Sequence, residues 1–413
     1  MTFLIRGIRQ LLTLRGPKGP RRGSALRELG IVPKGAVLIR EGIVVDAASA
    51  RHTENLYAAK AAEAINAGGR IAMPAFVDSH THAVFAMAAL RQFEARLQGD
   101  PAGVGTVPHE ARVGSGLSTA RLAHRAALRL QFMVRHGSTT IGVKSGYGAD
   151  EAGELKTLRV ARALGNSVAN LVPSFLAGKV MAAEHLENSP AYIDHVCNDL
   201  LPTLVRRRLI RMADLVCDPS RFSISEMRRY VRAAQALRLG VSLRANPRAT
   251  AEAVRLAVEE DALSVVNPGE CRESSIKALA ASQVLATLLP GTAFYPGGNE
   301  PPPARALIEA GAAVALATGF SPDLSPTFSM QMIVSLACSQ LRMTPAEAIS
   351  AATINGAHAL GLGSRTGSLE PGKSADLLLL NVSDYREIPF VFGVNQVHKV
   401  FKRGEIVYDD EKE

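Results

Sequence analysis

Short apolar segments alternate with longer amphipathic segments from Ile71 to about residue 360, and this alternation is the strongest constraint on the fold. The amphipathic segments include three with apolar side chains at helical spacing: Glu154–Leu164, Ile224–Leu239 and Ala251–Glu259. Eight strands that alternate with helices predict a (β/α)8 TIM barrel, and a doubly wound open sheet is the alternative. The strand candidates are Ala75–Val77, Thr139–Val143, Ser167–Val172, Leu215–Cys217, Val241–Leu243, Leu263–Val266, Val284–Leu288 and Ala313–Ala317.

Strand patterns also occur at both ends of the chain, outside this alternation. We therefore predict a small β domain formed by residues 1–70 and 361–413, packed tightly against a barrel domain of residues 71–360. Within the first segment, Ala58–Ala67 is expected to be a short helix. The terminal strand candidates are Thr2–Thr13, Ala36–Ile39, Ile43–Val45, Leu377–Leu380, Val397–Phe401 and Glu405–Tyr408.

The composition favours a cytoplasmic protein. The four cysteines are far apart and form no CxxC pair, which argues against a disulfide framework or a thiolate zinc site. No apolar run reaches the length of a membrane span, so we expect no membrane association. The first acidic residue is Glu28, and such an acid-poor start is also typical of a transit peptide. We favour the alternative that this start is a folded strand.

The net charge of +9 permits binding to nucleic acid. Two groups of arginines are candidates for such a surface: Arg206–Arg208 with Arg211, and Arg228, Arg229 and Arg232. Runs of this kind are more often solvated helix faces, and the chain has no tryptophan for base stacking. Nucleic acid is therefore not an expected partner.

In barrel enzymes the working residues lie at the C-terminal ends of strands, where this chain has His80 and His82 after its first barrel strand. Alternate residues of a strand face the same side, so the two imidazoles form half of a metal site. A catalytic zinc needs three protein ligands, and no other histidine ends a later strand candidate. Asp150, Asp218 and Asp323 follow strands, although such residues are more often caps.

A second motif, Val143–Gly148, follows the next strand candidate. Glycines on both sides of Tyr147 allow a sharp turn that directs the phenol into the barrel mouth. Lys144 is a candidate catalytic residue, although an exposed lysine is the more usual role.

With these motifs the chain resembles the imidazolonepropionase family of the amidohydrolase superfamily. The resemblance implies a TIM barrel of amidohydrolase type with a small β domain, a homodimer, and one zinc or iron ion. It also implies a hydrolase acting on C–N bonds, which opens the ring of 4-imidazolone-5-propanoate to N-formimidoyl-glutamate in histidine breakdown. The matching stretches are Gln10–Pro17, Phe93–Gly99, Lys144–Gly148 with Glu154–Lys156, Leu289–Gly291, Ser325–Thr327 and Thr366–Lys373.

The resemblance carries over to only part of the metal site. His80 and His82 match the metal-binding pair of the family. Arg244 stands where the family has a metal-binding histidine, and Gly319 where it has a metal-binding aspartate. A guanidinium repels a divalent cation, and glycine has no donor. We therefore expect a vestigial, incomplete metal site and no resident cofactor.

The substrate and catalytic positions are altered as well. Tyr147 matches the substrate-contacting tyrosine of the family, whereas Lys179 replaces a substrate-binding histidine. Pro247 replaces the catalytic glutamate and Asn267 the catalytic histidine. Neither replacement shuttles a proton at neutral pH, so we assign no catalytic residue.

Three interpretations of the altered pocket remain open. The pocket has drifted without selection, or Tyr147, Lys179, Arg244 and Asn267 bind a small anion in a pseudoenzyme or partner protein. The third interpretation is an active cyclic amidohydrolase with an altered zinc or iron set, completed by a residue such as Asp323.

Overall fold

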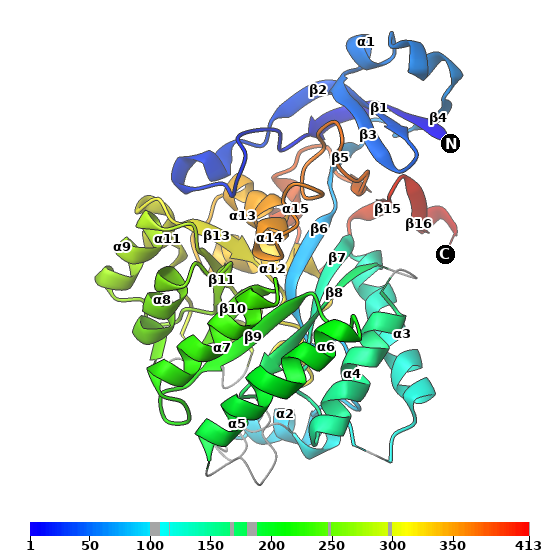
Figure 1. Cartoon of the computed structure of the whole chain (residues 1–413). Coiled ribbons are helices and arrows are strands. Elements are labelled where there is room, and N and C mark those ends of the chain that lie inside the picture. The colour runs from blue at the N-terminus through cyan, green and yellow to red at the C-terminus, as the bar shows by residue number, and fades with distance from the viewer. Residues whose placement is uncertain are drawn as a thin grey trace.

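The computed structural model describes residues 1–99, 108–114, 116–165, 169–179, 188–246, 249–295 and 300–412. Within these residues the chain forms a parallel sheet of eight strands, curved into a nearly closed barrel, and a second sheet built from both ends of the chain. The second sheet lies at one end of the barrel, and β6 runs from it into the barrel (Figure 1). The predicted TIM barrel with a small β domain is confirmed, and the open-sheet alternative is wrong.

Each barrel strand pairs in parallel with the next along the chain. The two edge strands are joined where Thr318 N–H donates to Asp78 Oδ1 at 3.0 Å and His82 N–H donates to Phe320 O at 2.7 Å. The strands are β6 (Phe76–Thr81), β7 (Ser138–Lys144), β8 (Asn170–Ala177), β9 (Met212–Cys217), β10 (Gly240–Ala245), β11 (Ser264–Val266), β12 (Leu285–Leu288) and β13 (Ala313–Leu316). Every strand candidate of the alternation overlaps one of them.

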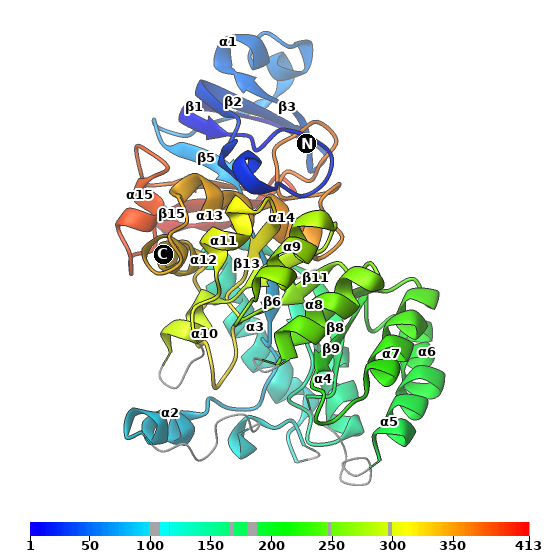
Figure 2. The same ribbon diagram turned by 90° about the vertical axis from the view of Figure 1, so that its left-hand side faces the viewer.

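Helices cover the outside of the barrel (Figure 2). The three helices predicted from apolar spacing correspond to α4, α7 and α8. None of the described helices is long and apolar enough to span a membrane. The helices are α1 (Ala50–Thr53), α2 (Leu90–Leu97), α3 (Thr119–Arg135), α4 (Glu151–Ala163), α5 (Ser189–His195), α6 (Leu201–Arg206), α7 (Ile224–Ala236), α8 (Thr250–Glu259), α9 (Glu273–Ala281), α10 (Pro290–Phe294), α11 (Ala304–Glu309), α12 (Met330–Ser339), α13 (Pro345–Ala352), α14 (Ile354–Ala359) and α15 (Glu387–Phe390).

The terminal sheet has the order β16-β15-β14-β5-β1-β2-β3, and β4 pairs with β1. Its strands are β1 (Thr2–Leu12), β2 (Ile31–Arg40), β3 (Ile43–Ser49), β4 (Glu63–Asn66), β5 (Ile71–Pro74), β14 (Leu377–Leu380), β15 (Val397–Lys402) and β16 (Glu405–Asp409). Strand β5 pairs with β1 and β14 in this sheet, whereas the barrel begins with β6.

The helix predicted for Ala58–Ala67 is wrong. Tyr57–Ala61 forms a 3-10 turn, and β4 then pairs in parallel with Phe3–Arg6 of β1. Ile65 packs against the core of the terminal sheet. A helix this short is only marginally stable by itself. As a strand, the segment instead forms backbone hydrogen bonds to β1, so tertiary contact overrides the local helix preference.

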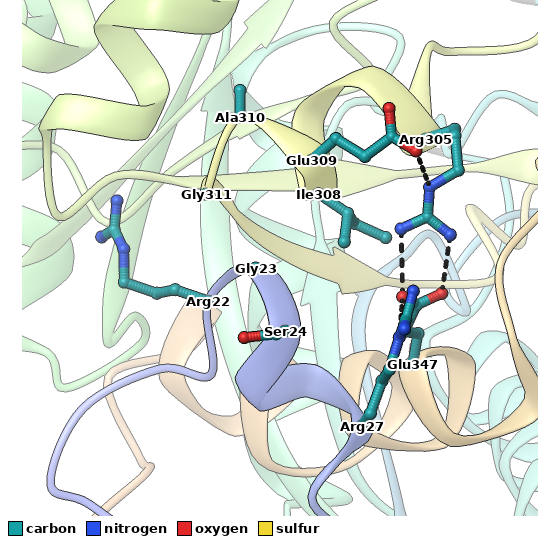
Figure 3. Close-up of a pocket in the computed structure, with 10 residues that line it drawn as sticks. All are labelled: Arg22, Gly23, Ser24, Arg27, Arg305, Ile308, Glu309, Ala310, Gly311 and Glu347. Carbon is teal, nitrogen blue, oxygen red and sulfur yellow. Dashed lines mark hydrogen bonds and ion pairs between the residues drawn. The ribbon is translucent and has the colours of Figure 1, made fainter.

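The chain between β1 and β2 crosses the barrel at the N-terminal ends of its strands, where Arg22 forms a bridge with Ala313, the first residue of β13. A cleft of about 490 Å³ lies here between Gly23–Arg27, α11 and α13. Figure 3 shows Arg27 and Arg305 reaching Glu347 on its floor, with nitrogen–oxygen distances of 3.0 Å. Through Arg27, Glu347 attaches the N-terminal segment to the barrel.

Candidate functional site

The predicted histidine pair lies at the C-terminal end of β6. His80 and His82 are both buried, and their ring centroids are 5.5 Å apart. His82 Nδ1 lies 3.0 Å from Ser145 O and 3.3 Å from Lys144 O. A backbone carbonyl only accepts, so Nδ1 carries the proton and Nε2 has the free lone pair. His80 Nδ1 is buried without a hydrogen-bond partner.

Both imidazoles are neutral at physiological pH. Burial lowers the pKa of His80 and of His82 well below the ordinary value. The positive charges of Lys179 and Arg244 lower both pKa values further, and Lys144 adds to the effect on His80. The field around the pair is therefore positive.

Lys179 follows β8 and approaches His82 across the barrel mouth. Its Nζ lies 3.5 Å from His82 Nε2 and 3.8 Å from the centroid of the Tyr147 ring. Burial lowers the pKa of Lys179 to about 7, against the attraction of Asp323. No carboxylate of the described residues lies within ion-pair distance of this amine.

A buried carboxylate from helix α4 shapes the loop that carries Tyr147. Glu154 accepts hydrogen bonds from Gly146 N, at 2.9 and 3.0 Å from its two oxygens, and from Gly148 N at 2.5 Å. Tyr147 OH donates to Asp323 Oδ1. Burial, and then the charge of Asp323, raise the pKa of Tyr147 well above its usual value, so the phenol is a neutral donor. Glu154 lies in a stretch that matches the family but was not among the predicted site residues, although it follows Gly148 by only six positions.

Arg244 is the penultimate residue of β10, and Asn267 directly follows β11. The register sets Arg244 opposite Val266, immediately before Asn267. Arg244 is half-buried and forms no hydrogen bond or ion pair with a described residue, yet its charge acts on both imidazoles and on Lys179. Asn267 adopts a left-handed conformation with φ of +52°. Pro247 lies outside the described residues.

Other candidates from the sequence have structural contacts instead. Lys144 is fully buried, and its Nζ lies 3.0 Å from both carboxylate oxygens of Asp214, a residue that the sequence analysis did not single out. Asp150 caps helix α4 by accepting from Gly153 N–H, and Asp218 accepts from Ser220 N–H in a turn. The expectation that Lys144 is exposed is wrong, because the side chain is buried in the barrel interior, where Asp214 neutralises its charge.

The donor set at the mouth does not fit the metal ion that the resemblance implies. Through its free lone pair His82 would ligate a metal by Nε2, and this atom faces the amine of Lys179. Gly319 offers no donor, and the nearby carboxylate Asp323 accepts the Tyr147 phenol. Among the described residues, no three His, Cys, Asp or Glu side chains gather as a metal site.

Comparisons with known proteins agree with this fold. Residues 71–407 match the amidohydrolase family. The chain is 39% identical over 412 residues to an imidazolonepropionase of Solibacter usitatus (97% of each chain). It is also 36% identical over 420 residues to an imidazolonepropionase of Herpetosiphon aurantiacus (98% of this chain and 96% of the relative).

Solved structures share the fold at low sequence identity. A triazine hydrolase variant has a TM-score of 0.75 and 17% identity, covering 99% of this chain and 95% of its own. An adenosine deaminase from Xanthomonas campestris with bound zinc has a TM-score of 0.69 and 18% identity, covering 98% and 92%. At this identity the likeness concerns the arrangement of strands and helices alone.

Proposed function

The chain belongs to the amidohydrolase family and within it to the imidazolonepropionases, and from this premise we propose that it binds a small carboxylate anion at the barrel mouth without a resident metal ion. The observation that carries the proposal is the 3.5 Å approach of Lys179 Nζ to His82 Nε2. A cationic side chain thus stands at the atom through which the imidazole would hold a metal.

The charges of the pocket support an anionic ligand. Arg244 is a permanent cation without a described partner, and Lys179 is partly charged near neutral pH. Partly buried cations are costly unless an anion accepts their hydrogen bonds. Asn267 lies at the same end of the barrel and offers a neutral amide donor for the rest of such a ligand, while the Tyr147 ring packs against the Lys179 amine.

A metal-dependent ring-opening hydrolase is the second candidate. It is favoured by the full-length similarity of 33–39% to proteins named imidazolonepropionase. The sequence similarity favours retained hydrolysis over its loss. The positive charges of the pocket favour anion binding instead. Asp323 would have to leave the Tyr147 phenol to complete such a metal set.

Metal content and turnover of the purified full chain separate the two candidates. We expect no bound zinc or iron by elemental analysis, no ring opening of 4-imidazolone-5-propanoate, and calorimetric binding of 3-(imidazol-4-yl)propionate. Changing Arg244→Gln should weaken that binding by about tenfold, because one charge-assisted hydrogen bond is lost. One tightly held metal ion per chain with ring opening would instead establish the hydrolase.

A restored metal set provides the positive control for the metal assay. In a Lys179→His, Arg244→His, Gly319→Asp variant we expect about one zinc per chain, since the set then has at least three donors and lacks the two cations. Gly319 has φ of +61°, which aspartate tolerates better than most residues. Its added Cβ would lie 3.2 Å from Leu289 Cδ1, a contact that a small shift relieves.

A further inference from the structure

We propose that Lys179 is a nucleophilic amine that forms a reversible imine with the carbonyl group of a small 2-oxo acid. The inference rests on the proposed function, because Arg244 is the group that would hold the carboxylate of such an acid. Beyond carboxylate binding, it assigns a covalent reaction to the barrel mouth and identifies the ligand as a 2-oxo acid.

Two lysines at neighbouring strand ends show what is particular to Lys179. Lys144 is locked between both oxygens of Asp214 at 3.0 Å, so its nitrogen is unavailable. The amine of Lys179 has a single hydrogen-bond partner among the described residues, the imidazole of His82. An amine that faces a base and lacks a carboxylate partner has the surroundings of a nucleophile.

His82 is oriented to move the proton of this amine. Its Nδ1–H donates to Ser145 O, which leaves the Nε2 lone pair directed at Lys179. The Tyr147 ring lies 3.8 Å from the same amine, and its hydroxyl donates to Asp323. A nucleophile, a base and a group that fixes the orientation of the base are therefore present together.

The step balances without any further reactant. The lone pair of Lys179 Nζ attacks the carbonyl carbon, and the carbonyl π pair moves to oxygen. His82 Nε2 receives a proton from the nitrogen and returns it to that oxygen. Loss of the hydroxyl group with a second proton from nitrogen forms the C=N bond and releases one water molecule. Hydrolysis reverses each step.

Arg244 sets the ligand class. In a 2-oxo acid the carboxylate is bonded directly to the reacting carbonyl, so a guanidinium that binds the carboxylate fixes the carbonyl as well. Arg244 pairs with Val216 near the end of β9. Strand β9 pairs with β8 at Ala177, two residues before Lys179, so Arg244 lies at the same end of the barrel as the reacting pair.

Reductive trapping tests the proposal. The full chain is incubated with pyruvate and sodium borohydride, which converts an imine to a stable secondary amine, and the modified peptide is located by mass spectrometry. We expect one adduct, on Lys179. Lys179→Arg should abolish it, whereas Lys277→Arg, at a lysine whose side chain is 73% exposed, should leave it unchanged. Arg244→Gln should raise the pyruvate concentration for half-maximal trapping by about tenfold.

Binding of lactate, which has no carbonyl group, distinguishes the two proposals. If lactate and pyruvate both bind but no adduct forms, or if adducts form only on exposed lysines, the imine is refuted and carboxylate binding stands. If neither acid binds and no adduct forms, the imine is refuted, and the proposed function fails as well if 3-(imidazol-4-yl)propionate does not bind. The Lys179→Arg chain keeps a positive charge, so it should still bind lactate, and this shows that loss of trapping is not loss of folding.

Discussion

At the scale of single residues, surroundings decide what each charged side chain does. Lys144 and Asp214 pair inside the barrel, and Ser174 also donates to Asp214. The sequence places Lys144 at the end of a strand, but the partner lies 70 positions further along the chain. Only the pairing of β7 and β9 with β8 between them shows that the two charges neutralise each other.

Replacing Lys144 by methionine should destabilise the fold strongly. The change leaves Asp214 buried without its cation, a loss of about 3–5 kcal/mol in the free energy of unfolding. Urea denaturation measures the loss. The double variant Lys144→Met, Asp214→Leu should recover much of it, because no unpaired charge remains. A single-variant loss below about 1 kcal/mol would show that the ion pair does not matter for stability.

At the scale of elements, helix α4 determines the shape of the loop after β7. The glycines around Tyr147 predict a sharp turn, and Gly146 indeed has φ of +108°. The turn is held by Glu154, whose carboxylate accepts from two loop N–H groups. Glycine allows the conformation, and the contact from the neighbouring helix selects it.

Glu154→Ala should release this loop. Two buried N–H groups lose their acceptor, so we expect a loss of about 2 kcal/mol in the free energy of unfolding. Carboxylate binding at the mouth should weaken too, since Tyr147 is no longer held. Calorimetry with 3-(imidazol-4-yl)propionate checks this, with Glu151→Ala on the same helix as the control. Equal binding by both variants would contradict a positioning role for Glu154.

At the scale of the whole molecule, strand β14 joins two cores. Leu378 and Leu380 pack in the main barrel core, whereas Leu377 and Leu379 pack in the core of the terminal sheet. All four side chains are fully buried. Because alternate residues of a strand face opposite sides, a four-residue apolar run is what a strand between two cores requires.

Leu378→Ala and Leu379→Ala should therefore reduce the stability of the fold by similar amounts, although the two side chains lie on opposite faces of this strand. Each removes a fully buried leucine, and we expect a loss of about 2–5 kcal/mol from each. Calorimetry should show one cooperative transition at a lower Tm in both variants. Separate transitions for the two parts would instead show that the cores unfold independently.

The attachment of the N-terminal segment should depend on pH through Glu347. Burial opposes ionisation of this carboxyl, but hydrogen bonds from Arg305, Thr344 N–H and Arg27 outweigh it and lower the pKa from 4.5 to about 2. The unfolded chain takes up the proton first, so the stabilisation is complete above about pH 4.5 and is lost as the pH falls toward 2.

Glu347→Gln should therefore cost about 3 kcal/mol at pH 6, from a pKa difference of about 2.5. The difference in the free energy of unfolding between the variant and the unchanged protein should become smaller as the pH falls below 4.5. Urea denaturation at each pH measures this difference. Glu309→Gln, at an exposed carboxylate beside the same cleft, is the matched control and should show little pH-dependent difference. If the difference in the free energy of unfolding does not change with pH, the ionised Glu347 carboxylate is not its cause.

The sequence by itself determined the barrel, the terminal strands and the position of the histidine pair. The spacing of apolar residues, every two residues in strands and every 3.6 in helices, is a local property that does not depend on which elements pack together. Strand β4 shows the limit, since its local pattern is helical and only pairing with β1 makes it a strand.

The tertiary structure alone decided what surrounds the histidines. Lys179 and His82 are 97 positions apart in the chain, and their contact exists because β6 and β8 both pair in parallel with β7, which brings their C-terminal ends to the same mouth. The capture of Lys144 by Asp214 has the same origin. Contacts across the chain depend on the distances that packing sets, and no local pattern encodes those distances.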